Sequence, residues 1–112
     1  MTQYVGIIGY PLKHSISPLF QQAAFDRLGL DIRYETWETG TEGLGDVVER
    51  LRRPENLGAN VTIPHKESVM TLLDRLEEPA GGIGAANVIA KTGLGLTGYN
   101  TDAVGFLRAM EE

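Results

Sequence analysis

The sequence predicts an α/β fold in which a mostly parallel sheet of about six strands lies between two layers of helices. The main observation is that short apolar segments bounded by glycine alternate along the chain with segments of helical periodicity. A length of 112 residues also suffices for one domain with a buried core. The content of 42% hydrophobic and 22% charged residues is typical of a globular domain.

The first half of the chain contains two predicted strand–helix units. Residues 4–9 (YVGIIG) form an apolar run bounded by glycine, which is typical of a buried strand. Residues 17–29 carry a broad apolar face and end at Gly29, so we expect a helix that stops there. Residues 32–38 alternate as a half-buried strand does, and residues 42–53 have the spacing of an amphipathic helix.

The second half begins with a predicted strand over residues 58–63 and a helix over residues 64–77. Residues 86–92 and 95–100 then predict two short strands joined by a tight turn, which we expect to form an antiparallel hairpin. Residues 101–112 predict a final helix. This order of elements favours a layered α/β/α sandwich whose sheet is parallel except at the hairpin.

Composition and charge exclude several classes of protein. A formal net charge of −5 argues against a nucleic-acid-binding surface. The chain has no cysteine, which excludes disulfides and thiolate metal sites, and His14 and His65 are too far apart to indicate a metal site. The apolar run at the N-terminus is too short for a signal peptide or a membrane span, so we expect a cytoplasmic protein that does not bind membranes.

The stretch HSISP (residues 14–18) places two serines where the first predicted helix begins. Pro18 suits the first helical position, which makes Ser17 the N-cap residue. Ser15 lies two residues earlier in an extended segment and should point to the same side. Two hydroxyl donors at the positive end of a helix form a receptor for a small anion such as a carboxylate. A capped helix with a spare serine is the commoner interpretation of this stretch taken alone.

Two further strand-to-helix junctions carry ionisable side chains. Lys66 falls in the first turn of the helix expected after residues 58–63, where the helix dipole disfavours a cation. A residue placed against a local rule in this way points to function, although a surface lysine also explains it. Asp102 falls in the first turn of the last predicted helix, where an acid is ordinary.

These junctions are expected to meet, because open α/β sheets bind ligands at the carboxyl ends of their strands. Two hydroxyls, a lysine and an aspartate suit a small hydroxylated carboxylic acid, with Lys66 and Asp102 handling a proton. The segment GAAN (residues 84–87) adds Asn87, whose amide can both donate to and accept from a hydroxyl.

Four blocks of the sequence, GYPLKHSISP, GANVTIPHKE, IGAAN and GYNTDAVGF, together resemble the N-terminal substrate-binding domain of the shikimate dehydrogenase family. The resemblance extends from about Val5 to Phe106. It implies that residues 1–112 form such a domain and end at the start of the linker to an NADP-binding domain. The implied activity is NADP-dependent interconversion of 3-dehydroshikimate and shikimate in aromatic amino-acid biosynthesis, by a monomer or homodimer.

The resemblance also implies a role for individual residues. Ser15 and Ser17 match the family's serines that bind the substrate carboxylate. Thr62 and Lys66 match a substrate-binding threonine and the catalytic lysine.

The remaining implied ligands lie at the start of the predicted hairpin or follow it. Asn87 and Asp102 match ligands of the ring hydroxyls, and Asp102 is the partner of the lysine. Thr101 contacts the substrate by analogy. Lys66 and Asp102 would hold the reacting hydroxyl and relay its proton while hydride is transferred at C3 of the ring.

The sequence departs from the family pattern at two positions, since Val88 stands where the family has threonine and Ala103 replaces a glycine. Neither GIIG (6–9) nor GIGAAN (82–87) provides G-x-G-x-x-G between a strand and a helix, so no NADP-binding loop is expected in this chain. Besides the substrate-binding half of a dehydrogenase, a stand-alone module that binds shikimate-like or quinate-like acids without turnover fits the same residues. A domain that serves association alone is a third hypothesis, which does not explain the position of Lys66.

Overall fold

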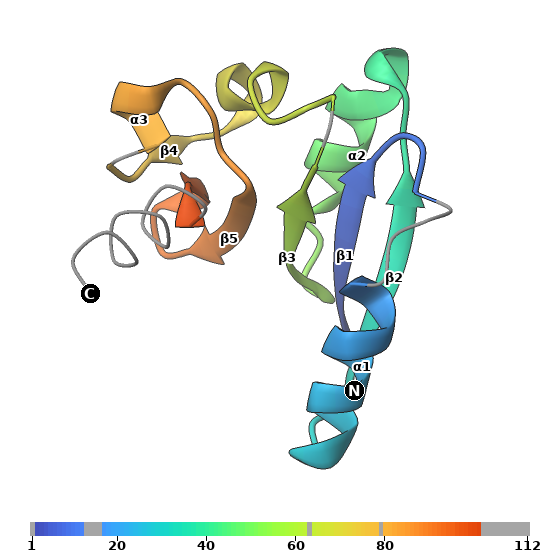
Figure 1. Ribbon diagram of the computed structural model, residues 1–112. Coiled ribbons are helices and arrows are strands. Elements are labelled where there is room, and N and C mark those ends of the chain that lie inside the picture. The colour runs from blue at the N-terminus through green and yellow to red at the C-terminus, as the bar shows by residue number, and fades with distance from the viewer. Residues whose placement is uncertain (1, 13–16, 63, 79, 102–112) are drawn as a thin grey trace, which may run out of the picture.

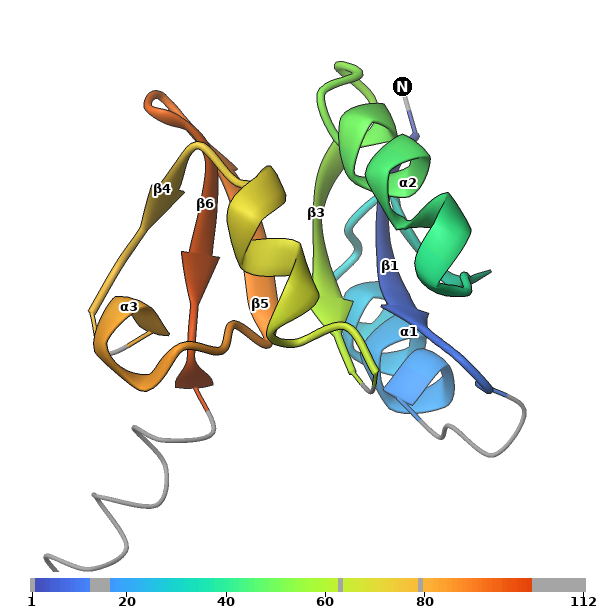
Figure 2. The same ribbon diagram turned by 90° about the horizontal axis from the view of Figure 1, so that it is seen from above.

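A computed structural model describes residues 2–12, 17–62, 64–78 and 80–101, without the side chain of Ser17 (Figure 1). It contains a 6-stranded sheet with the strand order β2-β1-β3-β5-β6-β4, which Figure 2 shows across its width. The elements in chain order are β1 (Gln3–Gly9), α1 (Ser17–Arg27), β2 (Ile32–Glu38), the 3₁₀ helix η1 (Thr41–Gly43), α2 (Leu44–Arg50), β3 (Asn56–Val61), the 3₁₀ helix η2 (Ser68–Leu72), β4 (Arg75–Leu76), α3 (Ala80–Ile83), β5 (Val88–Thr92) and β6 (Gly95–Tyr99).

The sheet is mostly parallel, as predicted. β1 runs parallel to β2 and to β3, and β4 runs parallel to β6. β5 is antiparallel to both of its neighbours, β3 and β6, so the predicted antiparallel hairpin is confirmed. Because β5 reverses direction between them, β3 and β6 run the same way and end at the same edge of the sheet.

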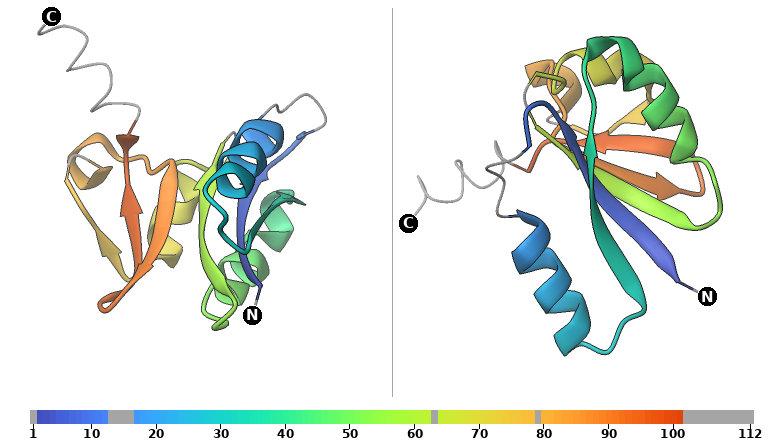
Figure 3. Two further views of the ribbon diagram at one scale, coloured as in Figure 1. Left: turned by 90° about the horizontal axis from the view of Figure 1, so that it is seen from below. Right: turned by 90° about the vertical axis from the view of Figure 1, so that its right-hand side faces the viewer.

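Helices cover both faces of the sheet, which confirms the three-layer α/β/α architecture (Figure 3). On one face, α2, η2 and α3 share a core with apolar side chains of β1, β5 and β6, including Ile8, Ile89 and Leu96. On the other face, α1 lies over β1 and β2 and contributes Phe25 to a smaller core around Ile7 and Tyr34. The two cores hold the sheet rigidly between the layers.

Helix α1 is less buried than its apolar pattern predicts. Leu19, Phe20 and Leu28 are 77%, 68% and 72% exposed. The helix is attached at the edge strand β2, where the carboxamide of Gln22 accepts from the amide of Tyr34 (2.7 Å) and donates to a β2 carbonyl (3.0 Å). A helix that rests on an edge strand leaves much of its circumference away from the sheet, so apolar side chains all around it cannot be buried together.

The prediction of a helix over residues 64–77 is wrong. This segment consists of turns, η2 and β4. The amide of Asp74 donates to the carbonyl of Leu96 (2.9 Å), and the amide of Glu77 donates to that of Gly98 (2.9 Å). Backbone groups that a helix would pair internally are therefore paired with β6, and tertiary pairing overrides the helical spacing of the apolar residues.

The other predictions of secondary structure differ less from the structure. The remaining predicted strands and the first two helices are present, with shifts of a few residues at their ends. Helix α3 has no counterpart in the prediction. The helix predicted over residues 101–112 lies outside the described residues except for Thr101.

Tyr34 makes the packing of the smaller core sensitive to high pH. Its side chain is 8% exposed, and its hydroxyl donates to Asn60 Oδ1 at 2.7 Å. Burial raises the pKa of Tyr34 from 10.0 to about 12, because the phenolate would lose its hydration. The unfolded chain releases this proton at a lower pH than the folded chain. Stability from this group is therefore complete below about pH 10 and is lost between about pH 10 and 12.

We expect Tyr34→Phe to lower the free energy of unfolding near neutral pH by about 1 kcal/mol, because Asn60 loses its donor. The same variant should lose less stability between about pH 10 and 12 than the unmodified chain, by up to about 2–3 kcal/mol. Urea unfolding at a series of pH values measures both effects, with Tyr10→Phe, at an exposed position, as the control. Equal losses in the Tyr34→Phe variant and the unmodified chain would contradict the expectation.

Candidate functional site

The polar residues predicted to converge come from segments that leave one edge of the sheet. Residues 62–66 follow β3, and Thr101 follows β6 after one intervening residue. Asn87 directly precedes β5, which enters the sheet between β3 and β6. Val88 pairs with Asn60 of β3 and with Tyr99 of β6. Asn87 therefore lies between the segment that carries Lys66 and the segment that carries Thr101.

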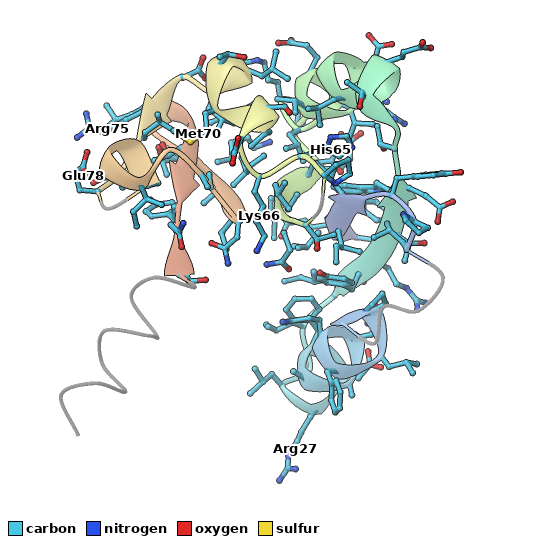
Figure 4. All side chains as sticks on the ribbon, turned by 45° about the horizontal axis from the view of Figure 1, so that its top comes forward. Arg27, His65, Lys66, Met70, Arg75 and Glu78 are labelled. Carbon is cyan, nitrogen blue, oxygen red and sulfur yellow. The ribbon has the colours of Figure 1, made fainter. Side chains whose placement is uncertain are left out.

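Lys66 lies in a turn that follows β3, and this turn is not the first turn of an α-helix. The turn begins at Thr62, whose amide donates to Ile8 at the end of β1 (2.9 Å) and whose carbonyl accepts from His65 (3.0 Å). The carbonyl of Lys66 accepts from the amide of Ala86 (2.9 Å). Figure 4 shows the half-buried Lys66 side chain at the middle of this edge, between β3 and β5. The backbone on which Lys66 stands is thus attached to both neighbouring parts of the sheet.

Asn87 joins three elements through its backbone and its side chain. Its carbonyl accepts from Val61 of β3 (2.7 Å), and its amide donates to Tyr99 of β6 (2.9 Å). Its side-chain oxygen accepts from the amide of Thr101 (2.8 Å), and its side-chain nitrogen donates to the Thr101 hydroxyl (2.9 Å). The Asn87 side chain thus accepts from the backbone amide of Thr101, as an N-cap residue would, but from the segment before β5.

Residues 85–87 together connect the segments of the site. Ala85 accepts a hydrogen bond at its carbonyl from the Asn100 side chain (3.0 Å), Ala86 donates to Lys66, and Asn87 binds Thr101. Asn100 is itself buried, with 8% exposure. The short segment before β5 therefore sets the spacing between the turn that carries Lys66 and the backbone that leads into residue 102.

The described structure brings four of the predicted site residues to this edge: Thr62, Lys66, Asn87 and Thr101. Thr62, Lys66 and Asn87 are half-buried, and Thr101 is exposed. Ser15 and Asp102 lie outside the described residues, as does the side chain of Ser17. Helix α1 begins at Ser17, which is the start of the predicted range but one residue before the first helical position predicted from Pro18.

Sequence reasoning missed one feature of the site, the buried imidazole of His65. His65 is only 1% exposed, and its Nε2 lies 2.5 Å from the carbonyl oxygen of Thr39, which follows β2. In the sequence, His65 bears only on the question of a metal site. Its position directly before Lys66 in the block NVTIPHKE is the signal that could have identified it.

A cavity of about 230 Å³ lies elsewhere, between α2 and the first residues of β1 and β3. Its walls include Tyr4, Trp37, Arg50, Arg53 and Asn56. None of the site residues that the structure describes, Thr62, Lys66, Asn87 and Thr101, lines it. The candidate site is therefore a set of side chains at an edge of the sheet and is separate from this cavity.

Within the described part of the chain, no three His, Cys, Asp or Glu side chains are grouped so that they could hold a metal ion. The described helices also include none that is long and apolar enough to cross a membrane.

The chain is an open α/β sheet whose polar side chains gather where its parallel strands end. This arrangement is typical of α/β domains that bind small molecules at that edge. Comparison with known proteins identifies the family. Residues 7–89 match the family described as "Shikimate dehydrogenase substrate binding domain". The chain belongs to this family.

Individual relatives agree with this result. The chain is 47% identical over 111 residues to a protein of Geobacter sulfurreducens named "Shikimate dehydrogenase (NADP(+))", covering 99% of this chain and 39% of that protein. A structure of shikimate 5-dehydrogenase from Thermus thermophilus in complex with NADP(H) and shikimate is 37% identical, with a TM-score of 0.88, and the match covers 98% of this chain and 42% of that one. The ligand-free 5-ketofructose reductase of Gluconobacter sp. strain CHM43 is 32% identical with a TM-score of 0.91, and the match covers 99% of this chain and 40% of that one.

The bonds between Asn87 and Thr101 predict how this edge responds to mutation. We expect Asn87→Ala to speed hydrogen exchange at the Thr101 amide and to lower the free energy of unfolding by about 1 kcal/mol, because two hydrogen bonds are lost. Asn87→Asp keeps the acceptor for that amide and should exchange more slowly than the alanine variant.

Amide exchange measured by NMR, together with urea unfolding, checks this expectation. Asn56→Ala is a matched control, because the Asn56 side chain donates to the Arg50 carbonyl (2.7 Å) at the other end of β3. The control should lose some stability without a selective effect at Thr101. Unchanged exchange at Thr101 in Asn87→Ala would show that the side chain does not hold this turn.

Proposed function

We propose that this chain is the substrate-binding domain of an NADP-dependent shikimate dehydrogenase, which interconverts 3-dehydroshikimate and shikimate. The observation that carries the proposal is the connection of the Lys66 turn to Thr101 through residues 85–87, within the blocks that resemble the family. The name of the Geobacter sulfurreducens relative and the shikimate complex of the Thermus thermophilus relative support it. In this proposal residues 1–112 are followed by an NADP-binding domain, in a cytoplasmic protein that is a monomer or a homodimer.

In this proposal, different residues bind the two parts of the substrate: its carboxylate, which stays charged, and its ring, which reacts. Ser15 and Ser17 donate hydrogen bonds to the carboxylate, whose charge is the same in shikimate and 3-dehydroshikimate. Thr62, Asn87 and Thr101 bind ring hydroxyls. Asn87 is suited to this role because its amide nitrogen has a second hydrogen besides the one that it donates to Thr101.

Lys66 and Asp102 carry the proton chemistry in this proposal. An ammonium group donates a hydrogen bond to the oxygen on C3 and stabilises negative charge that develops there as the carbonyl is reduced. Asp102 accepts a hydrogen bond from Lys66 or from the C3 hydroxyl and so keeps the lysine and the reacting oxygen oriented toward each other. The half-buried position of Lys66 strengthens these interactions, because fewer water molecules screen them.

The cofactor belongs to another part of the enzyme. NADP supplies or accepts the hydride at C3 of the ring when it is bound. The G-x-G-x-x-G run of this chain, residues 93–98, lies in the hairpin turn and in β6 and does not open a helix, so it does not fit the dinucleotide phosphates. The residues of this chain then bind the acid, orient its ring and hold the proton of the reacting oxygen.

The likeness to a 5-ketofructose reductase means that the fold alone does not select the substrate. 5-Ketofructose carries no carboxylate, whereas shikimate and quinate do. The paired serines at positions 15 and 17 favour an acid, and by resemblance Ser17 favours shikimate over quinate. A stand-alone module that binds such acids without turnover is the alternative, and it differs only in lacking a cofactor domain.

We expect the 112-residue chain alone to bind shikimate weakly and not to oxidise it with NADP. Without an NADP-binding domain beside it, this edge of the sheet is open on one side, so parts of the substrate stay hydrated and the lysine remains in contact with water. Titration followed by NMR measures the affinity, with 5-ketofructose as the comparison ligand, and a spectrophotometric assay measures turnover. Micromolar or tighter binding, or turnover by a chain free of host enzyme, would contradict this prediction.

Kinetics of the complete enzyme separate the two groups of residues. Ser17→Ala should reduce kcat/KM about tenfold to a hundredfold, mainly through KM, because it removes a hydrogen bond of about 1.5–3 kcal/mol to a group that does not change during the reaction. Lys66→Ala should lower kcat by roughly 10²–10⁴, because its oxygen partner changes charge along the reaction path. Asp102→Asn should resemble the lysine variant.

Lys91→Ala is the matched control for the lysine, since Lys91 donates to the carbonyl of Arg53 (2.6 Å), away from the site. It should leave kcat and KM unchanged. If Ser17→Ala instead abolished kcat while Lys66→Ala changed only KM, the proposed roles would be reversed.

A further inference from the structure

The imidazole of His65 connects the turn that carries Lys66 to the loop after β2. The ring is almost completely buried (1% exposed), and Nε2 lies 2.5 Å from the carbonyl oxygen of Thr39. A carbonyl oxygen only accepts, so Nε2 carries a proton and donates. A polar group in such a dry position is retained only where it is hydrogen-bonded, so this contact constrains the ring strongly.

Thr39 is itself held firmly, so the carbonyl oxygen that accepts from His65 has a fixed position. Its amide donates to the carbonyl of Gly9, the last residue of β1 (2.8 Å), and its hydroxyl donates to the carbonyl of Trp37 (2.8 Å). Thr39 is 7% exposed. The acceptor of the His65 bond is therefore part of the rigid end of β1 and β2.

The backbone at residues 65–66 is also held by η2 and by Ala86, which precedes β5. The carbonyl of His65 accepts from Val69 (2.9 Å), and the carbonyl of Lys66 accepts from Ala86 (2.9 Å). The main chain at 65–66 is thus fixed at Thr39 on one side and at Ala86 on the other. Figure 4 shows His65 and Lys66 directed to different sides of this turn, His65 toward β1 and α2 and Lys66 toward the edge.

We propose that His65 is a positioning residue, which sets the place of the Lys66 ammonium through the hydrogen bond between its Nε2 and the Thr39 carbonyl. This inference rests on the proposed function of Lys66. Without the bond, the turn keeps its attachment at Ala86 but loses the one at Thr39, whose buried carbonyl is left without this donor. Residues 65–66 then shift relative to Thr39, although Thr62 at the start of the turn stays bonded to Ile8 of β1 (2.9 Å). Reactions of this kind are sensitive to displacements of about 1 Å in a catalytic group. If the ring of His65 were needed only for packing, replacing its donor nitrogen by carbon would not move Lys66.

Two substitutions separate the donor from the ring. His65→Phe keeps a buried ring and removes the donor, whereas His65→Gln removes the ring and keeps a donor nitrogen at a similar distance from the backbone. In the complete enzyme we expect His65→Phe to lower kcat about fivefold to fiftyfold with KM within about twofold of normal. His65→Gln should recover most of this loss.

Thr97→Val is the control for the loss of a buried polar contact. Thr97 is 1% exposed, and its hydroxyl contacts the Thr92 hydroxyl (3.1 Å) near the hairpin turn. This variant should lose stability without a change in kcat. The 112-residue chain provides a readout that needs no substrate, because exchange of the Ala86 amide should be faster in His65→Phe than in His65→Gln or Thr97→Val.

The outcomes distinguish this inference from the proposed function. Normal kcat and normal Ala86 exchange in His65→Phe, or equal impairment of the Gln and Phe variants, would overturn the positioning role. If the unmodified enzyme does not turn over shikimate, the proposed function fails, and Ala86 exchange alone decides whether His65 fixes the turn. If His65→Phe does not fold, His65→Met replaces it, as a flexible side chain without a donor.

Discussion

The candidate site depends on the insertion of β5, running antiparallel, between β3 and β6. This strand makes β3 and β6 end at one edge, and its preceding residues 85–87 lie between those two ends. Asn87 uses its backbone for the sheet and its side chain for Thr101, so one residue fixes both the strand register and the turn beyond β6. A register shift of one residue would turn this side chain to the other face of the sheet and release Thr101. The geometry of the site is thus a property of the sheet pairing.

The site combines exposed or half-buried functional groups with a buried backbone. Thr62, Lys66 and Asn87 all have main-chain hydrogen bonds to strands or to one another's segments, while their side chains reach the edge. This division is physically reasonable, because a carbonyl or amide in the core must be paired, whereas a side chain at the edge can exchange water for a ligand. His65 is the exception, since its side chain is buried (1% exposed) while that of the neighbouring Lys66 is half-buried.

The fold class and most of the strands could be predicted because glycine-bounded apolar runs and alternation are local signals. The helix expected over residues 64–77 failed because Asp74 and Glu77 bond to β6, which comes later in the chain, and no local pattern contains that information. The polar residues of the edge could be predicted from junction positions and from the family resemblance. The link from His65 to Thr39 could not, because it joins residues that are distant in sequence and one of its partners is a backbone carbonyl, which any residue type supplies.

The proposal that a domain with a net charge of −5 binds an acid needs an account of why repulsion does not prevent binding. Five net negative charges at a distance comparable to the 14.0 Å radius of gyration repel a carboxylate by about 1.5 kcal/mol in unscreened water. At physiological ionic strength, screening over a Debye length of about 8 Å reduces this to roughly 0.3 kcal/mol. One hydrogen bond to a charged group contributes about 1.5–3 kcal/mol, so a single well-placed serine outweighs the whole net charge. The local arrangement of donors, and not the overall charge, therefore determines whether this edge accepts a carboxylate.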